Sequence, residues 1–153
     1  MSARPPVSEL TSHLGYWLRH VSNHVSSAFA RKLEGRGVTV AEWVVLRELH
    51  GPDAVAPSFL ARRLGMTRGA ITKLADRLIA KHLIVRKADL ADRRAQTLAL
   101  TGKGRRLVPE LAALADANEA EFFDGLAGKD RDALLRILKE VARRRNLTGV
   151  PVD

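Results

Sequence analysis

The chain has 153 residues, of which 46% are hydrophobic and 28% are charged, and its formal net charge is +9 at pH 7. This length and composition are typical of one globular domain, and we find neither an N-terminal signal sequence nor an apolar run near the roughly 20 residues of a membrane span. The sequence has no cysteine, which excludes disulfides, thiolate metal sites and thiol redox sensing, and we expect a cytoplasmic protein.

Two helices are predicted in the first third of the chain. Apolar residues recur there at spacings of three and four, which indicates a helix over 8–33. Thr39 and Glu42 form a capping box for a second helix, which we expect to reach about His50 before a glycine-proline pair breaks it.

Two short helices joined by a tight turn are predicted next. The first begins at Pro57 and Ser58 and is closed by Gly65. The second is capped by Thr67 and runs to about Lys81. Such a pair, with glycine in a turn of about three to four residues, is a helix-turn-helix. The apolar faces of the two helices are predicted to contain Phe59, Leu60 and Leu64, and Ile71, Leu74 and Leu78.

A β-hairpin is predicted immediately after the helix-turn-helix. Residues 83–87 and 96–100 have the composition of strands, and the polar stretch 89–94 joins them.

Two further helices are predicted in the C-terminal part of the chain. The first spans 102–123 after the N-cap Thr101, with Asn118 interrupting its apolar stripe, and the second runs from Asp130 to about Arg145. A small winged domain cannot cover these stripes alone, so we expect a homodimer formed through the two chain ends. The alternative is that the helices fold back on their own domain.

The predicted fold is mainly α with a small β-hairpin wing (α+β). We expect a single domain over 1–153, in which a winged helix-turn-helix lobe at 39–101 is flanked by dimerisation helices at 8–34 and 102–146.

Nearly all of the net charge lies in residues 56–106. This window holds 13 basic against 3 acidic residues, a balance of +10, whereas the rest of the chain holds 13 basic and 14 acidic residues, a balance of −1. A charge concentrated in one third of a chain indicates a surface that binds a polyanion.

The second helix of the helix-turn-helix has the pattern of a recognition helix. If its apolar residues face the core, its first turn and basic residues face outward and reach base edges in a major groove. Arg68 then suits guanine, Thr72 suits thymine, and Lys73 suits a base or a phosphate. The alternative is an ordinary solvated face. The residues predicted to face outward are Arg68, Gly69, Thr72, Lys73, Asp76 and Arg77.

The tip of the hairpin carries two adjacent arginines, Arg93 and Arg94, which suit a narrow minor groove. We expect Asp92 to hold an arginine in place through a charge-assisted hydrogen bond, with Arg94 or Arg77 as its partner. The alternative is a solvated turn with a local ion pair.

Two segments resemble the multiple-antibiotic-resistance regulator (MarR) family. Residues 92–105, Asp-Arg-Arg-Ala-Gln-Thr-Leu-Ala-Leu-Thr-Gly-Lys-Gly-Arg, resemble the wing signature of that family, and residues 60–74 resemble its helix-turn-helix. The order of the predicted elements also agrees. The resemblance implies a homodimeric winged-helix transcription factor that binds pseudo-palindromic double-stranded DNA. We expect it to act as a ligand-responsive repressor.

The resemblance also assigns roles to individual residues. It places Pro57 and Ser58 near phosphates, and it places Arg94, supported by Asp92, in a minor groove. The complete set of predicted DNA-binding residues is Pro57, Ser58, Thr67, Arg68, Gly69, Thr72, Lys73, Arg77, Asp92, Arg93 and Arg94.

The resemblance further implies an effector site for a small aromatic or anionic ligand between the dimerisation helices and the DNA-binding lobe. Trp43 and Arg47 share one face of the predicted second helix. The alternative is that Trp17 and Trp43 pack in the core or in an interface. The candidate pocket residues are Tyr16, Trp17, His20, His24, Trp43 and Arg47.

Other functions have weaker support in the sequence. His20 and His24 have metal-ligand spacing, and His13 lies roughly on the same side of the predicted helix. A metal-responsive regulator would need further ligands such as Glu9 or Glu110, and we predict no metal and no cofactor. We find no G-x-S-x-G elbow, H-E-x-x-H motif or P-loop, so we do not expect an enzyme. A winged-helix protein-interaction module without a DNA target is the remaining alternative, and the balance of +10 argues against it.

Overall fold

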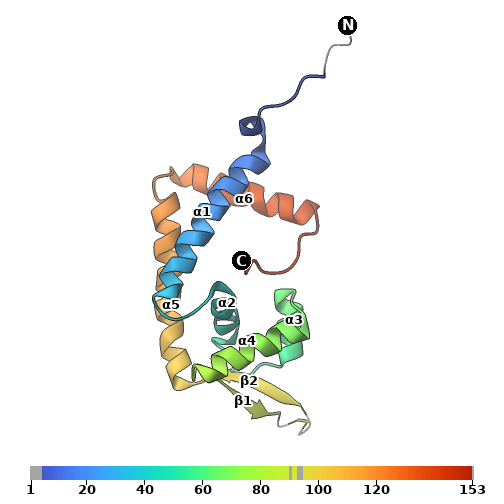
Figure 1. The fold of residues 1–153 in the computed structure, drawn as a ribbon, viewed down its shortest axis with the longest axis vertical. Helices are drawn as coiled ribbons and strands as arrows, with labels where there is room; N and C mark the ends of the chain where they lie inside the picture. The colour runs from blue at the N-terminus through green and yellow to red at the C-terminus, as the bar shows by residue number, and fades with distance from the viewer. Residues whose placement is uncertain (1–4, 90, 93–94, 153) are drawn as a thin grey trace.

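The computed structural model describes residues 5–89, 91–92 and 95–152. It confirms a mainly α fold with a β-hairpin, arranged as a winged helix-turn-helix lobe that long helices connect to a second group of helices (Figure 1). The elements, in chain order, are η1 (Leu10–Ser12), α1 (Leu14–Glu34), α2 (Val40–Leu49), α3 (Pro57–Leu64), α4 (Arg68–Ala80), β1 (Ile84–Ala88), β2 (Gln96–Leu100), α5 (Gly102–Phe123) and α6 (Gly128–Arg144).

The predicted first helix is divided into two pieces. His13 is extended between the 3-10 turn η1 and α1, so the prediction of one helix from residue 8 was wrong at its start. Ser12 Oγ donates to the Glu9 carbonyl at 2.7 Å, and Trp17 Nε1 donates to the Thr11 carbonyl at 2.9 Å. These local side-chain bonds offer the backbone an alternative to continuing the helix.

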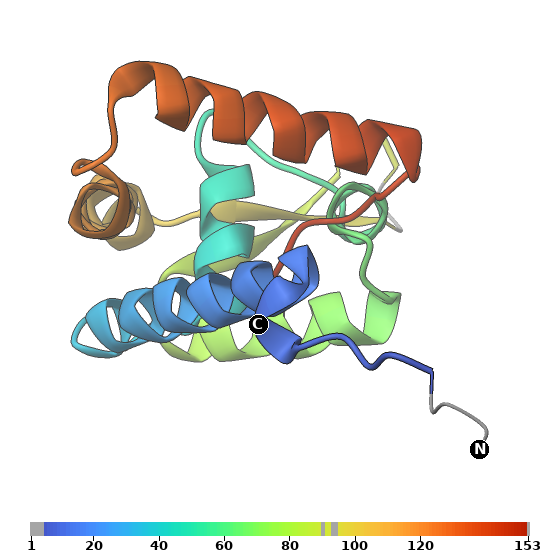
Figure 2. The same cartoon turned by 90° about the horizontal axis from the view of Figure 1, so that it is seen from above.

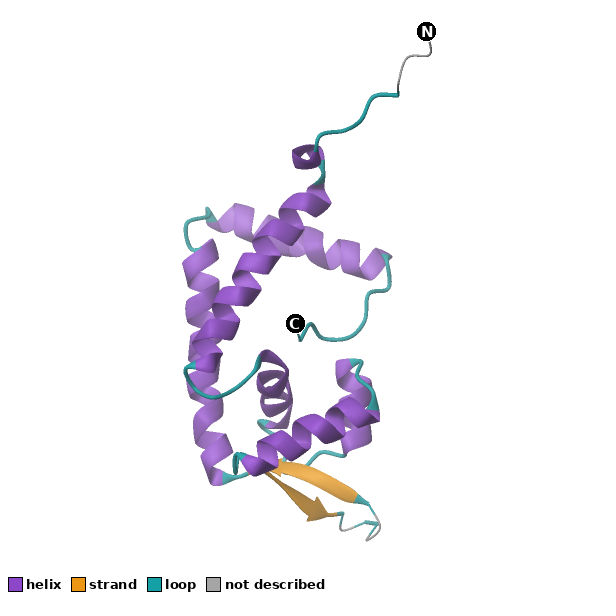
Figure 3. Ribbon diagram, viewed as in Figure 1, coloured by secondary structure: helices purple, strands orange, loops and turns teal. Residues whose placement is uncertain are grey.

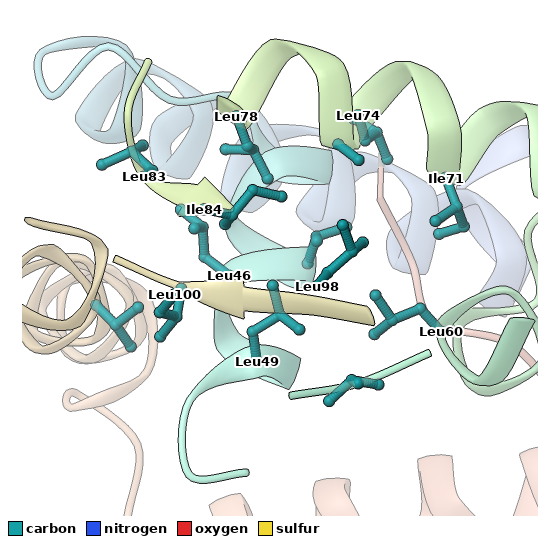
Figure 4. Packing of buried hydrophobic residues seen from close by; sticks show 14 of the residues in the cluster. Leu46, Leu49, Leu60, Ile71, Leu74, Leu78, Leu83, Ile84, Leu98 and Leu100 are labelled. Atoms are coloured by element: carbon teal, nitrogen blue, oxygen red, sulfur yellow. The ribbon is translucent and has the colours of Figure 1, made fainter. Parts of the chain in front are cut away.

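The hydrophobic core lies in the winged helix-turn-helix lobe. Side chains of α2, α3, α4 and the base of the hairpin meet there, with Leu46, Leu60, Ile71 and Leu98 among the most deeply buried (Figure 4). Phe59 was predicted on the apolar face of α3 but is 49% exposed. The residues of α3 that face the core are Leu60, Ala61 and Leu64.

An ion pair between buried Glu42 and partly exposed Lys81 joins the start of α2 to the end of α4. The Thr39 hydroxyl accepts a hydrogen bond from the Glu42 amide at 3.1 Å, as a capping box requires. The Glu42 carboxylate, 2% exposed, accepts from the Thr39 hydroxyl at 3.2 Å through Oε1 and from Lys81 Nζ at 2.6 Å through Oε2. Lys81 Nζ also donates to the Gly37 carbonyl at 2.7 Å. A buried charge is tolerated when it is paired in this way.

The hairpin strands pair antiparallel, with Ile84 opposite Leu100, and β1 starts one residue later than predicted. The reason is that the Leu83 amide closes α4 by donating to the Leu78 carbonyl at 3.0 Å. Gly104, in the first turn of α5, packs against this junction. A Cβ added to Gly104 would lie 2.1 Å from the Leu83 carbonyl oxygen.

The helix α5 crosses α1 around one buried amide. It runs from Gly102 to Phe123 as predicted, and Asn118, 4% exposed, lies between the two helices. Asn118 Nδ2 donates to the Val25 carbonyl at 3.1 Å, and its Oδ1 accepts from Lys32 Nζ at 3.0 Å. The interruption of the apolar stripe is therefore a satisfied polar contact between α1 and α5.

The last helix begins at Gly128, and its N-cap is Ala127 rather than the predicted Asp130. Asp130 lies in the first turn of α6, where a carboxylate still interacts favourably with the helix dipole. Seen from above, α6 and α1 lie on opposite sides of the molecule, with α5 at one end (Figure 2).

The first half of α1 and most of α6 expose apolar side chains. They line a groove of about 480 Å³ between α1, the end of α5 and α6. No helix within the described ranges is both long and apolar enough to cross a membrane. The apolar residues of the groove are Leu14, Trp17, Leu18, Val21, Val25, Phe123, Leu134 and Leu138.

The segment after α6 returns as a loop toward the helix-turn-helix (Figure 3). Gly149 meets Gly65 there, and a Cβ added to Gly65 would lie 3.0 Å from Gly149 Cα. The Val150 amide donates to the Leu64 carbonyl at 3.4 Å. The backbone of this tail thus contacts the turn between α3 and α4.

Candidate nucleic-acid interface

The turn between α3 and α4 directs the first turn of α4 into solvent. Gly65 ends α3 in the left-handed conformation, with φ 66°, which glycine adopts without steric cost. Thr67 then caps α4, because its hydroxyl accepts from the Ala70 amide at 3.1 Å. Arg68 and Gly69 follow as exposed residues of the first turn.

One face of α4 is buried and the opposite face is exposed, as predicted. Ile71, Leu74 and Leu78 lie in the core. Thr72 Oγ1 donates to the Arg68 carbonyl at 3.0 Å, so its hydroxyl proton is used within α4. The methyl group and the oxygen lone pairs of Thr72 remain available for contacts outside α4. The residues of the predicted site that are exposed along α4 are Arg68, Gly69, Thr72, Lys73 and Arg77.

The start of α3 lies beside the start of α4. Pro57 occupies the first turn of α3, and Ser58 is half-buried. Ser58, Arg62 and Arg68 line one recess of about 410 Å³ between the two helices. Arg62 was not among the predicted site residues, and its position in the sequence gave no sign that it would lie beside Arg68.

The hairpin closes through its own backbone. The Asp89 amide donates to the Ala95 carbonyl at 3.0 Å, and the Asp89 carboxylate accepts from the Ala91 amide at 2.9 Å. Asp92 is exposed. Arg93 and Arg94, predicted to enter a minor groove, lie outside the described residues, and the predicted pairing of Asp92 with Arg94 or Arg77 stays a prediction.

An ion pair connects α4 to the hairpin. Asp76 Oδ1 accepts a hydrogen bond from Arg86 Nη2 at 2.5 Å, although both side chains remain partly exposed. Asp76 therefore contacts β1 while it shares the exposed face of α4 with the predicted DNA-binding residues.

The candidate effector residues lie on two separate helices. Along α1, the Tyr16 ring stacks on His20 at 6.0 Å, and the His20 and His24 rings meet edge to face at 5.0 Å. On α2, Trp43 packs edge to face against Phe29 at 6.5 Å. Of the other two candidates, Trp17 lines the apolar groove and Arg47 is exposed on α2.

The residues named for a metal site are separated in the fold. Glu110 binds Arg36 at 2.6 Å, whereas the His13 ring contacts the Glu9 backbone carbonyl at 3.1 Å. Across the described ranges, no group of three or more His, Cys, Asp or Glu side chains is arranged to hold a metal ion.

Comparisons with known proteins identify relatives of this fold. Residues 36–95 match the model of the MarR family. The structure of CouR from Rhodococcus jostii RHA1 bound to p-coumaroyl-CoA is similar, with a TM-score of 0.75 and 28% identity over 95% of this chain and 100% of that chain.

Two other solved structures are similar over most of both chains. One is a MarR-family transcriptional regulator from Rhodococcus sp. RHA1, with a TM-score of 0.76 and 26% identity over 89% of this chain and 98% of that chain. The other is BpsR from Bordetella bronchiseptica, whose structure concerns the regulation of DNA binding by 6-hydroxynicotinic acid. Its TM-score is 0.77, with 25% identity over 90% of this chain and 98% of that chain.

Proposed function

We propose, on the premise that this chain belongs to the MarR family, that it is a cytoplasmic transcriptional regulator, not an enzyme, and that it represses by binding a pseudo-palindromic operator. The observation that carries this proposal is the exposed face of α4. Arg68, Lys73 and Arg77 project from it while the opposite face is buried. A helix suits a major groove when it is exposed along one side and its first turn combines a basic residue with small residues that allow close approach.

We propose that the regulator is a homodimer. The groove between α1 and α6 exposes leucines, a tryptophan and a phenylalanine, and a second copy of the chain would bury them. The dimer would set the two α4 helices about 34 Å apart, one turn of DNA. In this arrangement the helices at 8–34 and 102–146 serve dimerisation, and the lobe at 39–101 serves DNA binding.

A titration of the protein with DNA from its own upstream region tests this function. We expect two chains to bind one duplex, and we expect the affinity to fall about 10³- to 10⁵-fold between 50 and 200 mM salt if six to ten phosphates are contacted. Fluorescence anisotropy at several salt concentrations measures both quantities. Absence of binding at low salt would rule out the regulator and favour a protein-interaction module.

We further propose that a small aromatic acid or its conjugate regulates DNA binding. The support is that CouR was solved with p-coumaroyl-CoA and that BpsR responds to 6-hydroxynicotinic acid. The ring ladder of Tyr16, His20 and His24 on α1 offers aromatic surface and hydrogen-bonding nitrogen atoms to such a ligand. A ligand that prefers a spacing other than that of the DNA-bound dimer weakens DNA binding by that preference.

A thermal-shift screen with hydroxylated aromatic acids tests the effector proposal. A ligand at 100 times its Kd should stabilise the fold by about 2.7 kcal/mol and thereby raise the melting temperature. His20→Ala should abolish this shift, and His50→Ala, a change of the same kind at the exposed end of α2, should leave it intact. A shift that survives His20→Ala would place the ligand elsewhere.

A further inference from the structure

One acidic side chain lies on the exposed face of α4. Asp76 is one helical turn beyond Thr72 and Lys73 and directly precedes Arg77, so it shares the face assigned above to DNA. A carboxylate close to phosphates is repelled by them. Its presence on this face therefore weakens DNA binding unless Asp76 contributes in another way.

The contact that Asp76 makes suggests what this contribution is. Its Oδ1 accepts a hydrogen bond from Arg86 Nη2 at 2.5 Å. Arg86 belongs to β1, where it is opposite Leu98 of β2. The ion pair therefore joins the recognition helix to the wing, by which we mean β1, β2 and the turn between them.

The bond to Asp76 lies on the exposed part of β1. Ile84, at the start of β1, is buried, whereas Val85 to Ala88 are exposed. The core thus fixes the base of the wing, and the outer part of β1 extends beyond it. Arg86 lies two residues past Ile84 and is opposite Leu98, the outermost buried residue of β2, which also pairs with Val55. The core therefore holds β2 at this level, and the ion pair with Asp76 holds β1.

We propose that Asp76 is a positioning residue that fixes the direction in which the wing leaves α4. With this direction fixed, α4 and the wing reach neighbouring grooves of the same duplex together. Asp76 acts through Arg86 and does not itself bind DNA. The inference rests on the proposed function, because it assumes that both elements contact one DNA molecule.

The variant Asp76→Asn separates two effects of opposite sign. Loss of a negative charge beside phosphates, taken alone, should tighten binding and leave its salt dependence unchanged or steeper. Loss of positioning should weaken binding, and we expect a decrease of about 1.4- to fivefold, the range of an exposed ion pair. The plot of log affinity against log salt should become shallower by about 0.9 for each phosphate contact that the wing loses.

Three control variants accompany this measurement. Asp53→Asn removes the same charge from the exposed loop between α2 and α3 and should not weaken binding. Asp76→Glu keeps a carboxylate and should restore most of the affinity. In an Arg86→Gln background, Asp76→Asn should no longer weaken binding, because its partner is already gone.

The outcomes separate this inference from the proposed function. Binding by Asp76→Asn that equals or exceeds that of the wild type would overturn the positioning role, as would an unchanged effect in the Arg86→Gln background. Failure of the wild type to bind DNA would instead overturn the proposed function, and this inference with it. Melting curves and sedimentation of each variant establish that the fold and the oligomeric state are unchanged.

Discussion

Replacing Arg68 with alanine is expected to weaken operator binding by about 1–3 kcal/mol, or roughly 5- to 150-fold. Arg68 is the first residue of α4 and is exposed, and it lines a recess with Ser58 and Arg62. At this position its guanidinium can form two hydrogen bonds with a guanine edge in the major groove. Competition titrations with single-base operator variants measure both the affinity and the base preference.

The pattern of the loss identifies the contact that Arg68 makes. A base contact predicts that Arg68→Ala loses discrimination at one base pair, whereas a phosphate contact predicts an equal loss on every sequence. Arg136→Ala removes the same side chain from the exposed surface of α6 and should have little effect. If Arg68→Ala binds as tightly as the wild type, α4 does not read DNA through its first turn.

Replacing Gly104 with alanine is expected to destabilise the fold by about 2–3 kcal/mol, and to lower the melting temperature by roughly 4–12 °C. Helix propensity alone predicts the opposite sign, a gain of about 1 kcal/mol from Gly→Ala inside a helix. The steric contact decides the outcome, because the new Cβ would lie 2.1 Å from the Leu83 carbonyl oxygen and 3.2 Å from Leu100 Cδ2. That carbonyl also accepts from the Thr101 amide at 3.0 Å, so it cannot move without loosening the wing from α5.

Gly102→Ala is the matched control, two residues earlier in the same helix. The nearest atom to its added Cβ is the end of the Arg106 side chain, at 3.3 Å, and that side chain can move away. This variant should be as stable as the wild type or slightly more stable. Thermal unfolding of both variants measures the difference in stability. Equal melting temperatures would show that the Leu83 backbone shifts at little energetic cost.

The lobe from α2 to the wing was predicted well because its signals are local. Thr67 determines where α4 starts, and the spacing of Ile71, Leu74 and Leu78 determines which face is exposed. A left-handed glycine at Gly65 determines where α3 ends. These signals lie within a few residues of the elements they define, so the sequence pattern and the observed bounds agree.

The contacts between distant segments were not predictable in the same way. Asn118 seemed to be a defect in an apolar stripe until Val25 and Lys32, far away in the sequence, supplied its hydrogen bonds. The capping pattern placed Glu42 in the first turn of α2, but it gave no sign that the Glu42 carboxylate would also bind Lys81. In both cases the partner comes from another helix, and no spacing rule within one helix can identify it.

The contact between Gly65 and Gly149 implies unequal evolutionary constraint on the two residues. The turn after α3 needs glycine at position 65 for its left-handed backbone, whether or not the tail is present. The tail packs against Gly65, which has no side chain to keep it away. Among related chains, we therefore expect glycine to persist at the turn after α3. Glycine at position 149, whose φ is also positive at 90°, is needed only where the segment after α6 follows this path, so we expect it to vary together with that path.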